Sequence, residues 1–114
     1  MTDVLVVYEH ALAGRSLAMW LGQEVPGIHV ECMPLHDAGS FLAERSFRPR
    51  IVFLEANDAA NTSKRFVPGP WEALLRTSWA TGETAVKGPE GWIPVSAGEV
   101  RELAHEICRR ARAD

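Results

Sequence analysis

Apolar residues occur in short continuous runs near the N-terminus and in the middle of the chain. Residues 4–8 are apolar or aromatic throughout, and residues 51–54 form a second apolar run that ends at Glu55. Runs of this length, rich in β-branched residues, indicate strands that are buried on both faces, as in parallel sheets. Residues 28–33 instead alternate apolar and polar side chains, which predicts a strand near the edge of a sheet.

Two other segments carry apolar residues at helical spacing, one between His10 and Glu24 and one after Ser96. The stripe of the first consists of Ala13, Leu17, Trp20 and Leu21. The stripe of the second consists of Val100, Leu103, Ala104, Ile107, Cys108 and Ala111. Ser96 and Glu99 have the spacing of a capping box, which predicts that the last helix begins there. A shorter helix is predicted between the second and third strands, with Asp37 as its N-cap.

The order strand–helix–strand–helix–strand predicts an α/β fold with right-handed crossovers and helices on both faces of a parallel sheet. Residues 72–77 suit a strand by topology and a helix by propensity, and topology favours the strand. Residues 81–90 contain Gly82, Gly88 and Pro89, so we expect little regular structure there. Residues 91–95 are predicted to form the final strand.

Composition narrows the class of protein. The 114 residues suit a single domain, residues 1–114, and 46% hydrophobic with 24% charged residues is ordinary for a soluble globular protein. The net charge of -3 gives no sign of a nucleic-acid surface. Without a signal peptide or an apolar run of roughly 18–20 residues, we expect a cytoplasmic protein that does not contact membranes.

The chain also lacks the common motifs of enzymes and of metal sites. Cys32 and Cys108 lie far apart, and no His/Cys cluster has zinc spacing, so both cysteines are expected in the core and no metal is expected. No glycine-rich phosphate loop, cofactor motif or nucleophile–base pair is evident. We therefore expect neither a cofactor nor an enzymatic activity.

Residues 4–10, 49–55 and 91–96 together resemble, in order and spacing, the receiver domain of bacterial response regulators. That family carries an acidic pair after its first strand, a phosphorylated aspartate at the end of its third, and an aromatic switch residue followed by a lysine near its fifth. The resemblance covers the first half and the last quarter of the chain. It implies a flavodoxin-like, doubly wound parallel sheet of five strands, here with shortened third and fourth helices.

The resemblance places non-standard residues where the family keeps its acidic groups. Tyr8 and Glu9 stand at the acidic pair, so one carboxylate is lost from the cluster that would hold magnesium. Glu55 stands at the phosphoacceptor position. Its extra methylene displaces the carboxylate by roughly 1 Å, and a displacement of that size costs on the order of a hundredfold in rate.

The lysine position and the hydroxyl position complete the comparison with the family's phosphorylation site. Val95 stands at the lysine position and supplies no charge for a phosphoryl group, while Thr77 or Ser78 stands at the hydroxyl position. The resemblance therefore implies a pseudo-receiver, a signalling module of two-component type that is not phosphorylated. Glu55 can be interpreted as a mimic of the phosphorylated state, or as a carboxylate that is solvated or bonded to a nearby backbone N–H.

Two functions follow from this interpretation. The first is a protein–protein interaction module that binds a protein partner or forms a homodimer through its last strand and last helix. The residues predicted for that surface are Trp92, Arg101, Glu102 and His105. Trp92 is either an anchor for the partner or a filler of the space left by the shortened fourth helix. The alternative function is a sensor that binds a small ligand or a divalent metal in the acidic cleft at Glu9 and Glu55.

Overall fold

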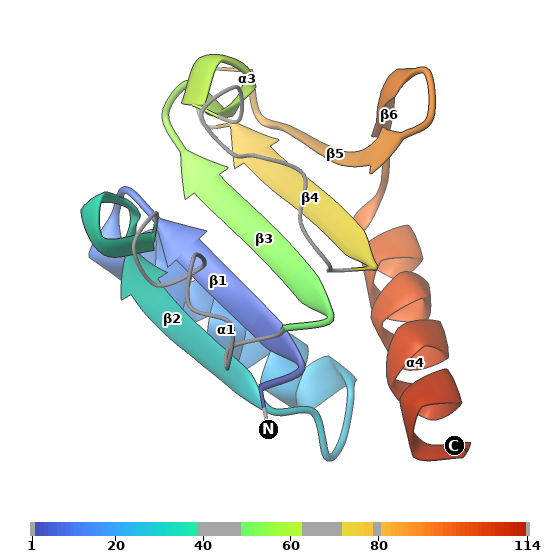
Figure 1. The fold of residues 1–114 in the computed structure, drawn as a ribbon. Coiled ribbons are helices and arrows are strands. Elements are labelled where there is room, and N and C mark those ends of the chain that lie inside the picture. The colour runs from blue at the N-terminus through green and yellow to red at the C-terminus, as the bar shows by residue number, and fades with distance from the viewer. Residues whose placement is uncertain (1, 39–48, 63–71, 79–80, 114) are drawn as a thin grey trace.

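The computed structural model describes residues 2–38, 49–62, 72–78 and 81–113 (Figure 1). Six strands and three helices follow one another in the order β1 (Val4–Tyr8), α1 (Ala11–Glu24), β2 (Val30–Pro34), β3 (Ile51–Ala56), α3 (Ala59–Thr62), β4 (Ala73–Ser78), β5 (Glu83–Gly88), β6 (Gly91–Pro94) and α4 (Ala97–Ala113). Residues 35–38 are also helical. Within the described residues, each helix is too short or too polar to cross a lipid bilayer.

The strands form one mixed sheet in the order β2-β1-β3-β4-β5-β6. The pairs β1–β2, β1–β3 and β3–β4 are parallel, whereas β4–β5 and β5–β6 are antiparallel. The predicted flavodoxin-like, doubly wound sheet of five parallel strands is therefore wrong. The parallel arrangement holds for the first four strands and ends at β4.

Short connections explain why the last two strands run antiparallel. Only residues 79–82 separate β4 from β5, and only Pro89 and Glu90 separate β5 from β6. A parallel pair needs a crossover of about a dozen residues or more, whereas an antiparallel pair needs only a tight turn. The same lengths leave no room for the shortened fourth helix that was predicted between these strands. Gly82 and Gly91 have φ values of 70° and 138°, which favour glycine at the starts of β5 and β6.

Residues 81–90 were predicted to have little regular structure, and this prediction is wrong because most of them form β5. Thr84 and Val86 point to the face of the sheet that carries α4, while Ala85 and Lys87 point to the other face. The final strand predicted at residues 91–95 is present as β6, although its direction is reversed.

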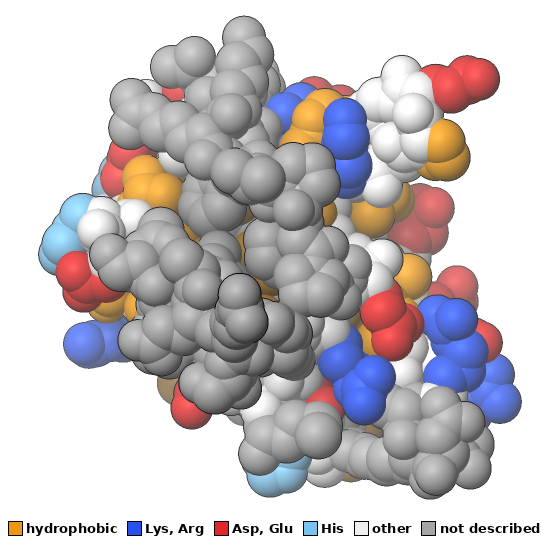
Figure 2. All heavy atoms as spheres, in the orientation of Figure 1, with side chains coloured by type: hydrophobic (Ala, Val, Ile, Leu, Met, Phe, Trp, Pro, Cys, Tyr) orange, Lys and Arg blue, Asp and Glu red, His pale blue; other side chains and the backbone are white. Residues whose placement is uncertain are grey.

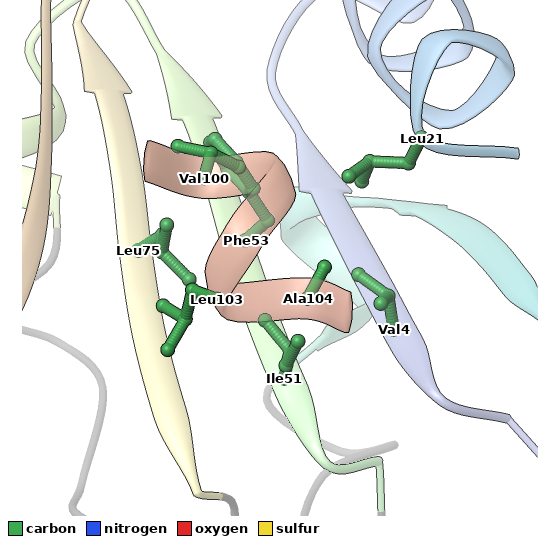
Figure 3. A pocket seen from close by; sticks show the side chains of 8 residues that line it. All are labelled: Val4, Leu21, Ile51, Phe53, Leu75, Val100, Leu103 and Ala104. Carbon is green, nitrogen blue, oxygen red and sulfur yellow. The ribbon is translucent and has the colours of Figure 1, made fainter. Parts of the chain in front are cut away.

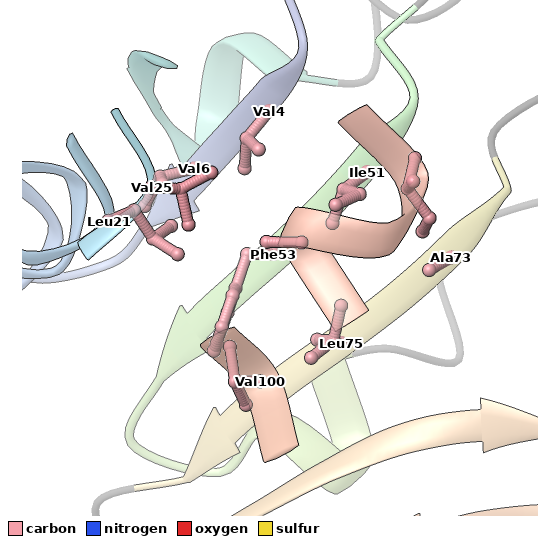
Figure 4. Packing of buried hydrophobic residues seen from close by; sticks show 11 residues of the cluster. Val4, Val6, Leu21, Val25, Ile51, Phe53, Ala73, Leu75 and Val100 are labelled. Carbon is pink, nitrogen blue, oxygen red and sulfur yellow. The ribbon is translucent and has the colours of Figure 1, made fainter. Parts of the chain in front are cut away.

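The core occupies both faces of the sheet. Under α1 and α4, the buried cluster shown in Figure 4 consists of Val4, Val6, Leu21, Val25, Ile51, Phe53, Ala73, Leu75, Val100, Ala104 and Ile107. On the opposite face, a second cluster consists of Leu5, Val7, Ala38, Val52, Leu54, Ala56 and Ala59. β1 and β3 thus contribute buried side chains to both clusters, which confirms the prediction from their continuous apolar runs.

Four further predictions concern single elements or residues. The capping box is confirmed, because Ser96 N donates to Glu99 Oε1 at 3.1 Å and Glu99 N donates to Ser96 Oγ at 3.2 Å. β2 lies at an edge of the sheet, as predicted. Asp37 is not an N-cap, because the helical residues already begin at 35. Cys108 is buried, but Cys32 is exposed on the edge strand, so only one cysteine lies in the core.

A small cavity of about 10 Å³ lies between α4 and the sheet (Figure 3). Its lining is apolar and consists of Val4, Leu21, Ile51, Phe53, Leu75, Val100, Leu103 and Ala104. We expect Val100→Ile to raise the free energy of unfolding by at most about 0.8 kcal/mol, the value of one buried methylene, because the added group fills this space. Urea denaturation measures the change. A clear loss of stability would show that the cavity does not accept a methylene group.

Candidate functional site

The carboxyl ends of β1, β3 and β4 lie side by side, which is where open α/β sheets bind ligands. The register aligns Tyr8, Glu55 and Thr77 in one row across these strands, and Thr84 on β5 continues the row. The structure thus brings together the end of the first strand and the Glu55 position, as the sequence predicted.

Glu55 is 1% exposed and points to the same face of the sheet as Phe53, the face that α1 covers. One carboxylate oxygen, Oε1, accepts a hydrogen bond from the backbone N–H of His10 at 2.9 Å. The other oxygen, Oε2, lies 2.9 Å from Nδ1 of the His10 imidazole. Of the two interpretations of Glu55, the carboxylate bonded to a nearby backbone N–H is the one that the structure contains.

His10 can make both contacts because of its place in the chain. It is the N-cap of α1, and its extended backbone (φ -111°, ψ 113°) directs its N–H toward β3. A carboxylate at this position also faces the N-terminal end of the helix, where unpaired backbone N–H groups favour negative charge. From the sequence, no role in the site was predicted for His10. Its position was the sequence signal that could have revealed this role. His10 closely follows β1, and Glu55 ends the apolar run of β3 at the same edge of the sheet.

The Glu55 carboxylate raises the pKa of His10 above its ordinary value of 6.5. The hydrogen bond between the two side chains is the main cause, and the negative charges of Glu55 and Glu9 act in the same direction. Partial desolvation opposes them and lowers the pKa. Because the His10 side chain is 51% exposed, it exchanges protons readily with solvent. The ion pair is present at mildly acidic pH and persists to a higher pH than the ordinary pKa of 6.5 would allow.

Protonation of His10 should make the stability of the fold depend on pH. A pKa that is higher in the folded state than in the unfolded state adds stability below the unfolded pKa, and this stability is lost as the pH rises through the folded pKa. We therefore expect the difference in melting temperature between the wild type and His10→Ala to shrink from about pH 5 to about pH 8. In a Glu55→Gln background the same substitution should leave no such pH-dependent difference. A constant difference across the range would contradict the ion pair.

Glu9 joins the ends of β1 and β3 in a different way. Its Oε1 accepts a hydrogen bond from Asn57 N at 3.0 Å, and its backbone N–H donates to the Glu55 carbonyl oxygen at 3.0 Å. The same Oε1 lies 3.9 Å from Nε2 of His10. Both carboxylates of the predicted acidic pocket thus lie next to one imidazole. Among the described residues, no three or more His, Cys, Asp and Glu side chains are grouped so that they could hold a metal ion.

The two candidate hydroxyls point to opposite faces of the sheet. Thr77 lies on the Glu55 face, and its Oγ1 is hydrogen-bonded to Thr84 Oγ1 at 2.9 Å. Ser78 is buried near α3, where its Oγ donates to the Asn57 carbonyl oxygen at 2.9 Å and accepts from Ala59 N at 3.3 Å. Thr77 is therefore the hydroxyl on the side of Glu55, and Ser78 fastens the start of α3.

Val95 supplies no charged group beside Glu55, and Tyr8 packs against α1. The backbone N–H of Val95 donates to the Thr84 carbonyl oxygen at 2.9 Å, and its side chain packs against the cluster under α1 and α4. With strands about 4.8 Å apart, three strand spacings place Val95 about 14 Å from Glu55. The extra strand β5, which lies between β4 and β6, adds one strand spacing to this distance. The Tyr8 side chain packs against α1 at Gly14 and is half buried.

The four residues predicted for one partner surface lie on two surfaces. Trp92 stacks with Arg76, whose Cζ is 4.0 Å from the ring centroid, and with Lys87, whose Nζ is 5.8 Å away. Arg76 alternates with Leu75 along β4, so this stack lies on the face opposite α4. In Figure 2, cationic atoms flank hydrophobic atoms at this end of the sheet.

The other three predicted residues are exposed on α4 and face the end of α1. Arg101 NH1 lies 3.6 Å from Glu24 Oε2, and His105 Nε2 lies 3.1 Å from the Glu24 carbonyl oxygen. Glu102 and His105 also line a groove with Val25 and Cys108. Trp92 and α4 therefore cannot contact one flat partner together. Trp71 and Trp79 lie outside the described residues.

A cleft of about 490 Å³ opens beside Glu55 on the α1 face of the sheet. Four residues of α1 and two residues of the sheet line it, namely Leu12, Ala13, Ser16, Leu17, Glu55 and Thr77. Leu12 is 81% exposed at the rim of this cleft. Sequence reasoning missed the α1 wall because Ala13 and Leu17 were interpreted only as core positions.

No protein-family model, no curated protein and no solved structure matches this chain.

Proposed function

We propose that the chain is a regulatory binding module that resembles receivers in its first four strands but does not accept phosphoryl groups. The observation that carries this proposal is the buried Glu55 carboxylate, both oxygens of which contact His10. Such a module signals by contact with a protein partner or with a second copy of itself. Both cysteines are free thiols, which suits a reducing compartment such as the cytoplasm.

Several observations support the loss of phosphoryl transfer. A nucleophilic carboxylate oxygen must be accessible for in-line attack, whereas the side chain of Glu55 is 1% exposed. Phosphoryl transfer also needs cations to stabilise the charge on the transferred group. Val95 supplies none and lies far from Glu55, and His10 is held on the carboxylate itself. No enzymatic activity is therefore part of the proposal.

Incubation with acetyl phosphate and magnesium chloride, followed by intact-mass measurement, tests this proposal. We expect no phosphoryl adduct on the wild type, because the Glu55 oxygens are buried and paired. His10→Ala serves as the comparison, since it removes the imidazole and leaves the carboxylate in place. If only His10→Ala formed an adduct, the His10 imidazole would be the group that protects Glu55 from phosphorylation. A stable, stoichiometric adduct at Glu55 of the wild type would refute the proposal.

One substitution on each of the two exposed surfaces can show which surface makes the proposed protein contact. Trp92→Ala removes the stacked ring opposite α4, and Arg101→Ala alters the exposed side of α4. Light scattering over a range of protein concentrations tests self-association, and a pull-down tests a different partner. Loss of the contact in only one variant identifies the surface that carries it. A contact that survives both substitutions would rule out both surfaces.

A second candidate function is a sensor that binds a small ligand, and the cleft beside Glu55 is the observation that favours it. Its volume of about 490 Å³ lies within the range of small-molecule sites, which are concave, mostly apolar and carry a few polar groups. A ligand that binds the folded state raises the melting temperature by mass action. Thermal-shift screening with amines, alcohols, carboxylates, nucleotides and divalent cations tests this candidate, and a flat response across the panel would count against it.

A further inference from the structure

The cleft has one charged group in an otherwise apolar setting. Leu12, Ala13 and Leu17 form the α1 wall, and Glu55 is the only charged residue among the six that line the cleft. Two hydroxyls complete the lining: Ser16, which is exposed at the rim, and Thr77, which is bonded to Thr84. A carboxylate beside apolar walls is complementary to a ligand with a cationic head and an apolar body. An anionic ligand would be repelled.

The His10 imidazole already occupies the position that a cationic head would take. Its Nδ1 contacts Glu55 Oε2 at 2.9 Å, and the side chain is 51% exposed. Because His10 is the N-cap and lies outside α1, its side chain can rotate into solvent without breaking a hydrogen bond of the helix. Glu55 Oε1 would keep its bond to the His10 backbone N–H after such a rotation. The imidazole is thus a replaceable partner, while the backbone N–H is a fixed one.

We propose that the cleft binds a small primary amine with an apolar body, and that the His10 imidazole is a built-in competitor which the amine displaces from Glu55. This inference rests on the second proposed function and names its ligand class. The ammonium group takes the place of the imidazole at Glu55 Oε2, and the apolar body lies against Leu12 and Leu17. Coverage of Leu12, which is now 81% exposed, adds a hydrophobic contribution to binding.

Displacement of His10 makes the affinity for an amine depend on pH. Two acidic side chains face the imidazole among the described residues, Glu55 at 2.9 Å and Glu9 at 3.9 Å. Both favour the imidazolium form, which competes more strongly than the neutral imidazole. Alkylamines remain protonated up to about pH 10, as lysine does. The affinity should therefore rise as the pH increases through the pKa of His10, which lies above its ordinary value of 6.5.

Titration with three ligands of one skeleton tests the proposal: phenethylamine, 2-phenylethanol and phenylacetate. Two-dimensional NMR follows the backbone amides of Leu12, Glu55 and Thr77 in the full chain. We expect phenethylamine to bind on the order of tenfold more tightly than 2-phenylethanol, since its ammonium group adds charge–charge attraction to the hydrogen bond with Glu55, whereas a hydroxyl offers the hydrogen bond alone. Phenylacetate should not bind. Circular dichroism confirms that each variant is folded.

Three variants separate the parts of the proposal. His10→Ala should raise the affinity for phenethylamine by on the order of tenfold near neutral pH and abolish its pH dependence, because the competitor is gone. Glu55→Gln should reduce the affinity for phenethylamine to that for 2-phenylethanol. Ser16→Phe should block both phenethylamine and 2-phenylethanol, since the ring fills the mouth of the cleft. If Glu55→Gln does not fold, the ligand comparison and His10→Ala decide the question.

The possible failures are distinguishable. Equal binding of phenethylamine and 2-phenylethanol to the wild type would overturn the amine proposal and leave the ligand-binding function standing. No change in affinity with His10→Ala would overturn the role of His10 as a competitor. If none of the three ligands shifts the cleft amides, whereas another compound of the thermal-shift panel binds there, only the amine proposal fails. If nothing in the panel binds, both proposals fail.

Discussion

Replacement of Gly14 by alanine is expected to destabilise the protein by about 3 kcal/mol, at the upper end of the usual cost of overpacking. Gly14 is buried in α1, where a Cβ would come within 2.7 Å of Cγ and 2.8 Å of Cδ2 of Tyr8, and closest of all to Tyr8 Cβ. Tyr8 Cβ is fixed by β1, so the clash cannot be relieved by rotation of a side chain. α1 would have to move away from the sheet, together with the N-cap His10.

Gly22→Ala is the matched control, because Gly22 lies in the same helix with nothing within 4 Å of an added Cβ. There alanine should stabilise the protein by up to about 1 kcal/mol, since it favours the helix and restricts the unfolded chain. Urea denaturation of the two variants measures both effects. The opposite signs identify close packing as the cause. If Gly14→Ala were also neutral or stabilising, α1 would not pack on Tyr8 as described.

Replacement of Glu55 by alanine is expected to lower the free energy of unfolding by about 2–4 kcal/mol, from lost charge-assisted hydrogen bonds and from the cavity left behind. The side chain is 1% exposed, so solvent compensates little of this loss. The backbone N–H of His10 also loses its acceptor at the start of α1. This cost is larger than that of a typical surface carboxylate, for which changes stay within about 0.5 kcal/mol.

Glu55→Gln is the matched variant, since it keeps the shape and one acceptor oxygen but removes the charge. We expect a smaller loss of stability than for Glu55→Ala, because the amide oxygen still accepts from His10 N. The contact with the imidazole should weaken at the same time, as the acceptor no longer carries a negative charge. Thermal and urea denaturation at one pH compare the two variants. Equal stability of all three proteins would mean that Glu55 is solvated and not held by His10.

Much of the fold could be predicted from hydrophobic patterning. The continuous runs of β1 and β3, the alternation of β2 and the capping box of α4 each have a local physical cause, and all four are confirmed. The error lay in residues 81–90, where Gly82, Gly88 and Pro89 were weighted as breakers of structure. Glycine and proline also form tight turns, and two turns so close together indicate antiparallel strands. The β-branched residues Thr84 and Val86, two positions apart, were the overlooked signal of a strand.

The site was predictable only where it depends on the parallel part of the sheet. Glu9, Glu55 and Thr77 meet at one edge because β1, β3 and β4 are parallel and in register. Val95 was placed beside them only on the assumption of a fifth parallel strand, and the antiparallel hairpin moves it away. His10 was missed because a single histidine has no spacing pattern. Its role arises from the N-cap geometry of α1, which sequence alone does not specify.

The His10 imidazole holds the Glu55 carboxylate at the end of β3. Titration of His10 by NMR, in the wild type and in Glu55→Gln, measures this pairing directly. We predict that the pKa of His10 lies above 6.5 in the wild type and falls back toward that value when the charge of Glu55 is removed. An identical pKa for His10 in the two proteins would mean that the ion pair does not form, and the proposals built on it would fail.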